Sequence, residues 1–256
     1  MVVELPHAVF VDLDDTIVDG SAVVDCWKVA CECCGSTIDS RTVLTEILRL
    51  RDWFWADPER HRVGRLDLRA ARRQIAEMAV TNVGCDDHTL AARIAERYDD
   101  CRDARTALFP GAVDVLTWLR ASGCRLALLT NGATDAQREK IDRFRLAPLF
   151  DLILIEGELG FGKPDERIYR LALTELAAAP RHTWMIGDNL EFDVGQPQKL
   201  GITGIWVNAT GTVLPADCDI CPDLVIKRLA ELRECIGLPV SSDRVPVNSE
   251  GSSTEP

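Results

Sequence analysis

The stretch from Val9 to Asp19, which reads VFVDLDDTIVD, constrains the fold of this chain more than any other segment. Its β-branched and aromatic residues predict a buried strand at about 8–13. That strand would carry Asp12 and Asp14 to its carboxyl end, where a parallel sheet normally places its ligand. Two close carboxylates repel each other unless a cation offsets their charge, and together they can act as nucleophile and proton carrier. The alternative is a strand that ends in an acidic turn.

The composition favours a globular protein with a substantial core. The chain has 256 residues, of which 46% are apolar, and this indicates one large domain or a core with a smaller insertion. The sequence contains no run of about 18 apolar residues, so it predicts no membrane span. Its first residues do not resemble a signal peptide. We therefore expect a cytoplasmic protein. A net charge of −12 disfavours nucleic-acid binding, which needs a basic surface.

Ten cysteines are distributed along the chain, and we expect them to remain reduced thiols. A chain with an ample core and no export signal has little need of disulfides. One group, at positions 26, 31, 33 and 34, falls on one predicted helix with a spacing that does not match paired zinc ligands. Cys218 and Cys221 form an isolated C-x-x-C segment. We expect no metal or redox role for either group.

The segment between Arg41 and Arg73 is basic although the whole chain is acidic. It contains nine arginines against five acidic residues. Such an island can steer an anionic substrate towards a site. The alternative is a solvated helix surface on which the arginines form ion pairs with neighbouring acids.

Helical periodicity replaces the strand pattern after Gly20. Apolar residues recur at i, i+3 and i+4 in four consecutive segments with no strand among them. Asp39 and Asp87 are expected N-caps, and Gly35 and Gly84 are expected helix stops. The sequence therefore predicts a helical insertion of about 85 residues. Its helices are expected at 22–34, 39–55, 66–83 and 87–107.

From Phe109 onward, short apolar runs alternate with helical segments. Near-continuous apolar strands separated by helices are typical of a parallel sheet covered on both faces. We therefore predict a Rossmann-like, doubly wound α/β core. Its later strands are expected at 125–129, 152–155, 184–186 and 204–207, and its helices at 112–122, 133–144, 166–177, 193–200 and 223–236. The polar stretch 239–256 reads as a disordered tail.

Polar groups follow several of the predicted strands. Beside the first two carboxylates, the chain offers a hydroxyl, an amide, an ammonium group and two further carboxylates near strand ends. Because the carboxyl ends of parallel strands share one edge of the sheet, we expect these groups to converge. Together they suit a phosphoryl group held beside a magnesium ion. They are Thr130, Asn131, Lys163, Asp188 and Asp193.

These motifs resemble the haloacid dehalogenase-like (HAD) hydrolases, in their phosphatase branch. The family's D-x-D-x-T motif matches Asp12 to Thr16, and its second motif matches the apolar run that ends in Thr130. Its lysine matches Lys163 before a proline, and its G-D-x-x-x-x-D motif matches residues 187–193. All four occur in order. The resemblance implies a core domain formed by 1–19 and 108–238, and a helical cap of the C1 type (subfamily I) at 20–107.

The resemblance also implies a role for each motif residue. Asp12 attacks phosphorus and becomes an aspartyl-phosphate, and Asp14 protonates the leaving oxygen and later activates water. Magnesium is held by Asp12, by the backbone carbonyl of Asp14 and by Asp188. Phosphate oxygens are held by Thr130, by Lys163 and by the backbone amide of Asn131. Supporting roles fall to Thr16 and to Asp193, which supports either the waters around the metal or Lys163.

Residues near a break between cap helices are candidates for contact with the leaving group. The alternative for each of them is cap packing and surface charge, and for Arg60 and Arg62 also a subunit contact. The candidates are Trp53, Trp55, Arg60 and Arg62, with His61 and Arg65 beside them.

The expected function is therefore magnesium-dependent hydrolysis of a phosphomonoester on a small phosphorylated metabolite. The alternatives are a phosphotransferase such as a sugar-phosphate mutase, or a binding protein that has lost activity. An acid at position 14 disfavours dehalogenation, in which no leaving group needs a proton. Residues 157–163 nearly spell a phosphate-binding P-loop, but Pro164 replaces the required hydroxyl residue. We expect a monomer or homodimer that binds neither nucleic acid nor a membrane.

Overall fold

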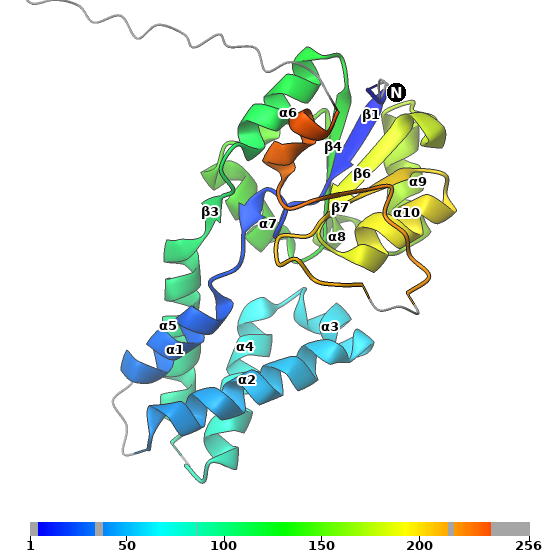
Figure 1. The fold of residues 1–256 in the computed structure, drawn as a ribbon. Helices are drawn as coiled ribbons and strands as arrows, with labels where there is room; N and C mark the ends of the chain where they lie inside the picture. The colour runs from blue at the N-terminus through cyan, green and yellow to red at the C-terminus, as the bar shows by residue number, and fades with distance from the viewer. Residues whose placement is uncertain (1–4, 34–37, 86, 215–217, 237–256) are drawn as a thin grey trace, which may run out of the picture.

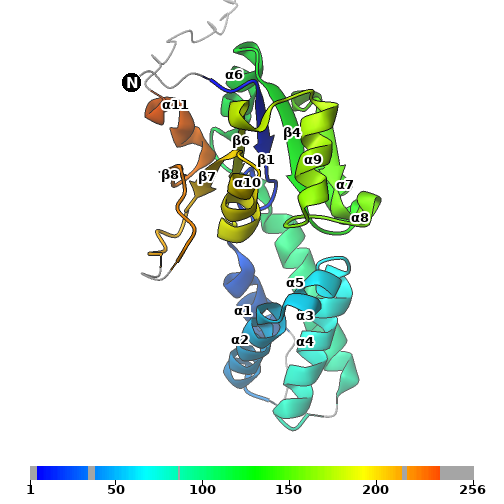
Figure 2. The same ribbon diagram turned by 90° about the vertical axis from the view of Figure 1, so that its right-hand side faces the viewer.

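The computed structural model of the chain describes residues 5–33, 38–85, 87–214 and 218–236. Figures 1 and 2 show two parts. One is a sheet flanked by helices, which we call the sheet part. The other is a bundle of helices at the carboxyl end of the strands, which we call the helical part. The tail predicted at 239–256 lies outside the described residues. Within the described residues, no helix is both long and apolar enough to cross a membrane.

The sheet part contains a six-stranded sheet in the order β5-β4-β1-β6-β7-β8, in which every neighbouring pair is parallel. From β1 the chain first adds strands on one side and then, from β6 onward, on the other. Ligands bind where the strand order reverses in this way. The strands are β1 Ala8–Val11, β4 Arg125–Thr130, β5 Leu152–Ile155, β6 Thr183–Gly187, β7 Thr203–Val207 and β8 Leu224–Ile226.

Both faces of this sheet are buried, which explains why its strands are continuously apolar. Along β1, Val9 and Val11 belong to one hydrophobic cluster, while Ala8 and Phe10 belong to another on the opposite face. The predicted doubly wound α/β core is therefore confirmed. The helices of this part are α6 Ala112–Ala121, α7 Thr134–Arg143, α8 Glu156–Leu159, α9 Glu166–Glu175, α10 Gln196–Lys199 and α11 Leu232–Cys235.

The helical part has a hydrophobic cluster of its own. Asp39 and Asp87 accept hydrogen bonds from backbone amides at the starts of two helices, as N-caps. The structure also has a helix at Pro58–Gly64 that the periodicity did not predict. It begins there because Asp57 is an N-cap and Pro58 suits the first helical position. The helices are α1 Val23–Cys33, α2 Ser40–Ala56, α3 Pro58–Gly64, α4 Leu68–Asn82 and α5 His88–Arg105.

Two chain segments connect the parts, and they pair with each other. Strand β2, Val18–Asp19, is antiparallel to β3, Ala107–Leu108. They lie where the sequence places the domain boundaries, after residue 19 and before residue 108. That division stays a prediction.

The helix predicted at 223–236 is wrong for most of its length. Leu224–Ile226 forms β8, which pairs in parallel with β7, and only Leu232–Cys235 is α-helical at its end. A short apolar run fits a strand and a buried helix equally well by periodicity, and here the free edge of β7 decides. Similarly, the helix predicted at 193–200 is divided into a π-helical turn at Leu190–Gly195 and the short α10.

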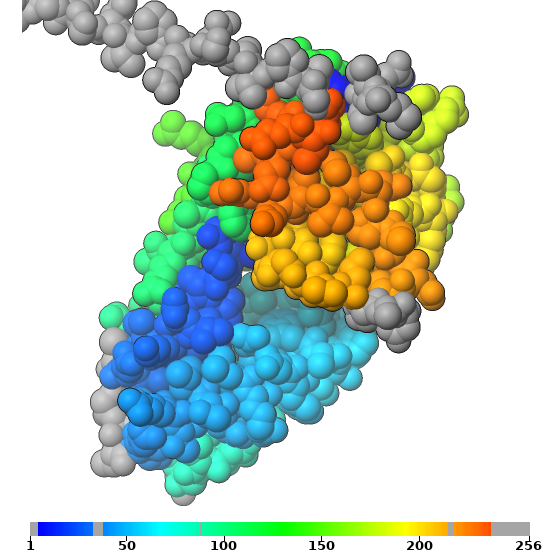
Figure 3. All heavy atoms as spheres, in the orientation of Figure 1, coloured from blue at the N-terminus to red at the C-terminus, as the bar shows by residue number. Residues whose placement is uncertain are grey.

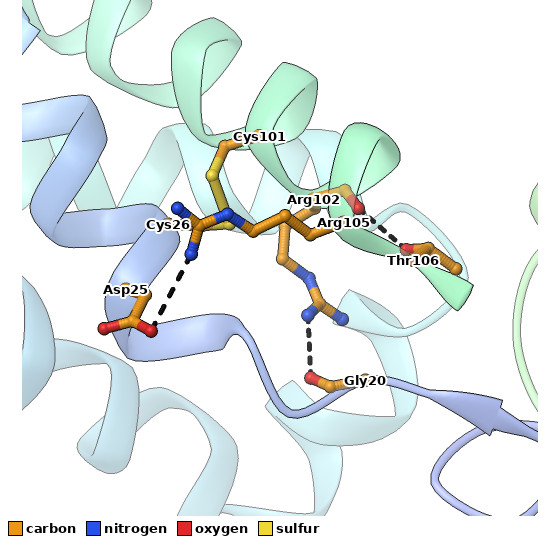
Figure 4. Close-up of a disulfide and its surroundings, with 7 residues drawn as sticks. All are labelled: Gly20, Asp25, Cys26, Cys101, Arg102, Arg105 and Thr106. Carbon is orange, nitrogen blue, oxygen red and sulfur yellow. Dashed lines mark hydrogen bonds and ion pairs between the residues drawn. A yellow bond between two sulfur atoms is a disulfide. The ribbon is translucent and has the colours of Figure 1, made fainter. Parts of the chain in front are cut away.

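The expectation that all cysteines are reduced is wrong for Cys26 and Cys101. The structure joins them in a disulfide between α1 and α5, with the Cα atoms 5.5 Å apart (Figure 4). They are 75 positions apart in sequence, so only the packing of the two helices reveals that the distance suits a bridge. Cys218 and Cys221, by contrast, are free thiols.

Candidate active site

The edge of the sheet formed by β1, β4 and β6 gathers the residues that the motifs predict. Asp12 follows β1, Thr130 is the last residue of β4, and Asp188 follows β6. Lys163 comes from the loop between α8 and α9. The convergence predicted from the strand ends is therefore present in the structure.

A buried lysine joins two of the carboxylates. Lys163 Nζ donates to Asp12 Oδ1 and to Asp193 Oδ1, each at 2.6 Å. The three side chains are 3%, 10% and 1% exposed, respectively. Of the two supporting roles expected for Asp193, the structure shows the contact with Lys163.

Asn131 fixes the position of this lysine. Its Oδ1 accepts from the Lys163 backbone amide at 2.8 Å, and its Nδ2 donates to the Lys163 carbonyl at 2.7 Å. The sequence assigned Asn131 a backbone role at the phosphate. The structure adds a side-chain role, because both bonds hold the lysine main chain to the end of β4.

The G-D-x-x-x-x-D motif turns back on itself through the π-helical turn at Leu190–Gly195. Asp193 Oδ2 accepts from the Asn189 amide at 3.0 Å, which brings the Asp193 carboxylate under the end of β6. A Cβ atom at Gly187 would collide with this carboxylate. Glycine is therefore the residue that allows Asp193 to reach Lys163.

Asp12, Asp188 and Asp193 form a cluster that we call the carboxylate cluster. One oxygen from each lies within 4.8 Å of the others, as ligands of a single metal ion would. Burial raises the pKa of Asp12 well above its ordinary value, although Lys163 acts in the opposite direction. Burial and the charges of Asp193 and Asp15 raise the pKa of Asp188 to about 7.

Three carboxylates face the single ammonium group of Lys163, so the carboxylate cluster contains more negative charge than Lys163 balances. A buried set of oxygen ligands with excess negative charge fits a hard divalent cation. The residues present therefore fit the expected metal. Asp193 joins Asp12 and Asp188 in this cluster, the metal contact expected from the Asp14 backbone carbonyl stays a prediction, and the side chain of Asp14 lies against another element.

That element is α7. Lys140 Nζ donates to both Asp14 oxygens, at 2.6 and 2.7 Å, and Gln137 Nε2 donates to Asp14 Oδ2 at 2.9 Å. Gln137 also donates to Thr130 Oγ1. Burial acts to raise the pKa of Asp14, but Lys140 and Gln137 outweigh it and lower that pKa. Asp14 is therefore ionised in this arrangement.

Sequence reasoning missed Gln137 and Lys140. A signal was available, because α7 begins four residues after Thr130 and the two side chains are three positions apart on one helix face. Thr16, predicted as a supporting residue, is buried, and its hydroxyl has no hydrogen-bond partner among the described residues.

The candidates in the helical part have different positions. Trp53 is 43% exposed and the Arg60 guanidinium lies over its ring, so these two residues hold each other at the surface. Arg62 forms an exposed ion pair with Glu59. Trp55 lines a cavity of about 830 Å³ that Asp188 also lines.

Arg65 links the helical part to the sheet part. Its Nε and Nη2 donate to both oxygens of Glu156, at 2.7 and 2.6 Å, and both side chains are largely buried. Glu156 also accepts from the Gly132 amide, at 3.0 Å. The bidentate ion pair therefore ties the helical part to the loop that follows β4.

Comparison with known proteins agrees with the motifs. The family model for haloacid dehalogenase-like hydrolases matches residues 6–201. Phosphoserine phosphatase of Thermus thermophilus is 39% identical over 180 residues, which are 70% of this chain and 65% of the relative. Glyceraldehyde 3-phosphate phosphatase of Pyrococcus furiosus is 27% identical over 252 residues, which are 95% of this chain and 98% of the relative.

The similarity to the phosphoserine phosphatase, to other phosphatases and to a nucleotidase spans only about half to two thirds of the length of those relatives. Among solved structures, the HAD-hydrolase YfnB from Bacillus subtilis superposes with a TM-score of 0.72 at 21% identity. That likeness covers 92% of this chain and 100% of the other, and it concerns the fold.

Proposed function

The chain belongs to the haloacid dehalogenase-like hydrolases, and we propose that it is a magnesium-dependent phosphomonoesterase that acts on a small phosphorylated metabolite through an aspartyl-phosphate. The observation that carries this proposal is the buried contact of Asp12 with Lys163 inside the carboxylate cluster. The relatives support the substrate class, because their names specify phosphoserine and glyceraldehyde 3-phosphate as substrates.

In the first step, Asp12 attacks phosphorus and the ester oxygen leaves. The contact with Lys163 fixes Asp12 Oδ1, which leaves Oδ2 to attack. Lys163 and Thr130 hold the phosphoryl oxygens, since a carboxylate approaches a phosphate dianion only where positive charge and hydrogen-bond donors offset the repulsion. Asp12, Asp188 and the backbone carbonyl of Asp14, with Asp193 beside them, would hold a divalent cation that would supply further positive charge at this point.

Asp14 handles the proton. It is ionised against Lys140 and Gln137 in this structure, so it must gain a proton and release that contact before it can protonate the leaving oxygen. In the second step the ionised Asp14 takes a proton from the water that attacks the aspartyl-phosphate. We therefore assign Lys140 and Gln137 the task of stabilising the ionised form of Asp14 between the two steps, after it has protonated the leaving oxygen and before it takes the proton from water.

Replacement of Asp12 by Asn tests the proposal. The change keeps the shape and removes the nucleophile, so magnesium-dependent phosphate release should fall below about a hundredth of the wild-type rate. Asp114→Asn, the same change at an exposed position on α6, is the matched control and should retain full activity. Phosphate release by Asp12→Asn close to the wild-type rate would contradict the assignment of the nucleophile.

Cellular location and assembly also belong to this proposal. We propose a monomer or homodimer in the cytosol. The Cys26–Cys101 disulfide is the feature that speaks against this location, because cytosolic thiols are usually kept reduced. Alkylation of the two thiols in intact cells, read by mass spectrometry, distinguishes a reduced cytosolic form from a disulfide-bonded one.

A further inference from the structure

The cavity of about 830 Å³ lies where the helical part meets the sheet part, and Figure 3 shows the recess between them. Asp188 and Asp15 line it from the sheet part. A phosphoryl group held at the carboxylate cluster would therefore extend its leaving group into this space. The wall on the other side is formed by aromatic and basic side chains, Trp27, Trp55, Tyr98, Arg51, Arg72 and Arg102.

Arg102 is half-buried and forms no salt bridge within the described residues, although its charge acts on Asp14 and Asp15. Figure 4 shows its side chain directed from α5 towards Gly20, whose carbonyl accepts from Arg102 Nη1 at 2.7 Å. Its Nε is buried and has no hydrogen-bond partner within the described part of the chain. The neighbouring Arg105, in contrast, reaches Asp25 at the surface. A buried N–H that lacks an acceptor is costly, and an anionic ligand would supply the missing acceptor.

Arg72 is held firmly on the same side of the cavity. Its Nη1 donates to Asp99 Oδ1 at 2.6 Å, and its guanidinium lies 5.1 Å from the centre of the Tyr98 ring. Tyr98 is itself stacked on Trp27, with ring centroids 3.8 Å apart. Within the described residues, Arg72 donates one hydrogen bond, to Asp99. Its remaining N–H groups can therefore bind a ligand.

Arg72 and Arg102 also line the adjacent cavity of about 670 Å³, which contains Asp14 and Lys140. The two guanidinium groups thus lie where both cavities meet, beside the proposed proton carrier. Arg51 lines the larger cavity but not the adjacent one. Among the described residues, Arg72 and Arg102 are the arginines that line both cavities, so these two are the cations placed to select a substrate.

We propose that the substrate is a phosphomonoester whose leaving group carries a carboxylate, and that Arg72 and Arg102 bind this carboxylate. The inference rests on the proposed phosphatase function and specifies its substrate class. Guanidinium groups suit a planar carboxylate because they can donate two parallel hydrogen bonds to it. The aromatic wall of Trp27, Trp55 and Tyr98 then packs against the carbon skeleton.

Pairs of phosphate esters that differ by one carboxylate test this proposal. Phosphoserine is compared with phosphoethanolamine, and 3-phosphoglycerate with glycerol 3-phosphate, by kcat/KM in the presence of magnesium. The wild-type enzyme should prefer the carboxylate-bearing member of each pair. Arg102→Gln and Arg72→Gln should each lose about 10- to 100-fold on that member and less than about 3-fold on its partner. Arg102→Lys should restore part of the preference, because it restores the charge.

Arg105→Gln and Arg73→Gln are the matched controls, because they remove exposed arginines from the same two helices. Both should keep the wild-type preference. Thermal unfolding of each variant shows whether it is folded, and the ratio within a pair is unaffected by the fraction of folded enzyme. Equal losses on both members of a pair would overturn the proposal and assign the arginines a structural role.

The generic ester 4-nitrophenyl phosphate separates this proposal from the proposed function. If the wild-type enzyme hydrolyses it but shows no preference for a carboxylate, the inference on substrate class is wrong and the phosphatase function stands. If the enzyme hydrolyses none of these esters, both are wrong. A stronger preference for a bisphosphate than for any carboxylate-bearing ester would also overturn the choice of carboxylate.

Discussion

Lys163 is the residue on which the geometry of the candidate site depends. Its ammonium group lies between Asp12 and Asp193, and its main chain is held from both sides by the Asn131 side chain. A lysine this deeply buried is stable only beside carboxylates, and indeed Asp12 and Asp193 raise its pKa against the effect of burial. The lysine therefore remains charged, which its proposed role in binding phosphate requires.

Replacement of Asn131 by Ala tests this dependence. The change removes both bonds to the Lys163 main chain, so the lysine should lose its position and kcat should fall by about 10- to 100-fold. The matched control is Asn82→Ala, which removes an amide that contacts Glu46 at the surface of the helical part. Steady-state kinetics of the two variants make the comparison. Equal kcat values for Asn131→Ala and the wild type would show that Lys163 does not need this support.

At the scale of elements, helix α7 and the helix pair α1–α5 provide contacts that no sequence motif predicted. Helix α7 follows β4 closely enough for Gln137 and Lys140 to reach Asp14. Helices α1 and α5 lie next to the connections between the two parts, and the Cys26–Cys101 disulfide fixes them to each other. The bridge closes a long loop and therefore restricts the unfolded chain.

Reduction of this disulfide should lower the free energy of unfolding by about 2–4 kcal/mol. Thermal unfolding with and without a reductant measures the effect, and the midpoint should be lower under reducing conditions. Cys26→Ala should have a lower midpoint than the wild type and no further response to the reductant. Cys218→Ala keeps the bridge and should respond to the reductant as the wild type does. An unchanged midpoint of the wild type under reduction would contradict the bridge.

For the whole molecule, the sheet part contains the proposed reacting groups and the helical part encloses the space in front of them. The ion pair of Arg65 with Glu156 holds the two together, and Glu156 is only 4% exposed, so water cannot readily replace the arginine if it is lost. Breaking a buried pair from one side leaves an uncompensated charge. The enclosure of the active-site cavity should depend on this contact.

Arg65→Gln should therefore weaken the enclosure. We expect kcat/KM to fall by about 10-fold or more, because water enters the recess and the leaving group loses its fixed surroundings. Arg62→Gln is the matched control, since Arg62 pairs with Glu59 at the surface three residues away. Amide hydrogen exchange of the loop after β4 should also increase in Arg65→Gln. If the kinetics and exchange of Arg65→Gln match those of Arg62→Gln, the contact does not hold the enclosure.

The sequence was sufficient for features that repeat locally or follow from strand order. Apolar runs placed β1, β4, β5, β6 and β7, and the polar residues after them marked one edge of the sheet. It was insufficient where distant segments decide the outcome. Strand β8 depends on the edge of β7, the Cys26–Cys101 pair on helix packing, and the partner of Asp14 on the orientation of α7.

The central claim is that Asp12 carries the phosphoryl group between the two steps. The most direct measurement is acid quenching of the enzyme during turnover, followed by peptide mass spectrometry. We predict one added phosphoryl group on the peptide that contains Asp12, present only while substrate and magnesium are supplied. A phosphoryl group on a different residue, or none at all during continued turnover, would contradict the account.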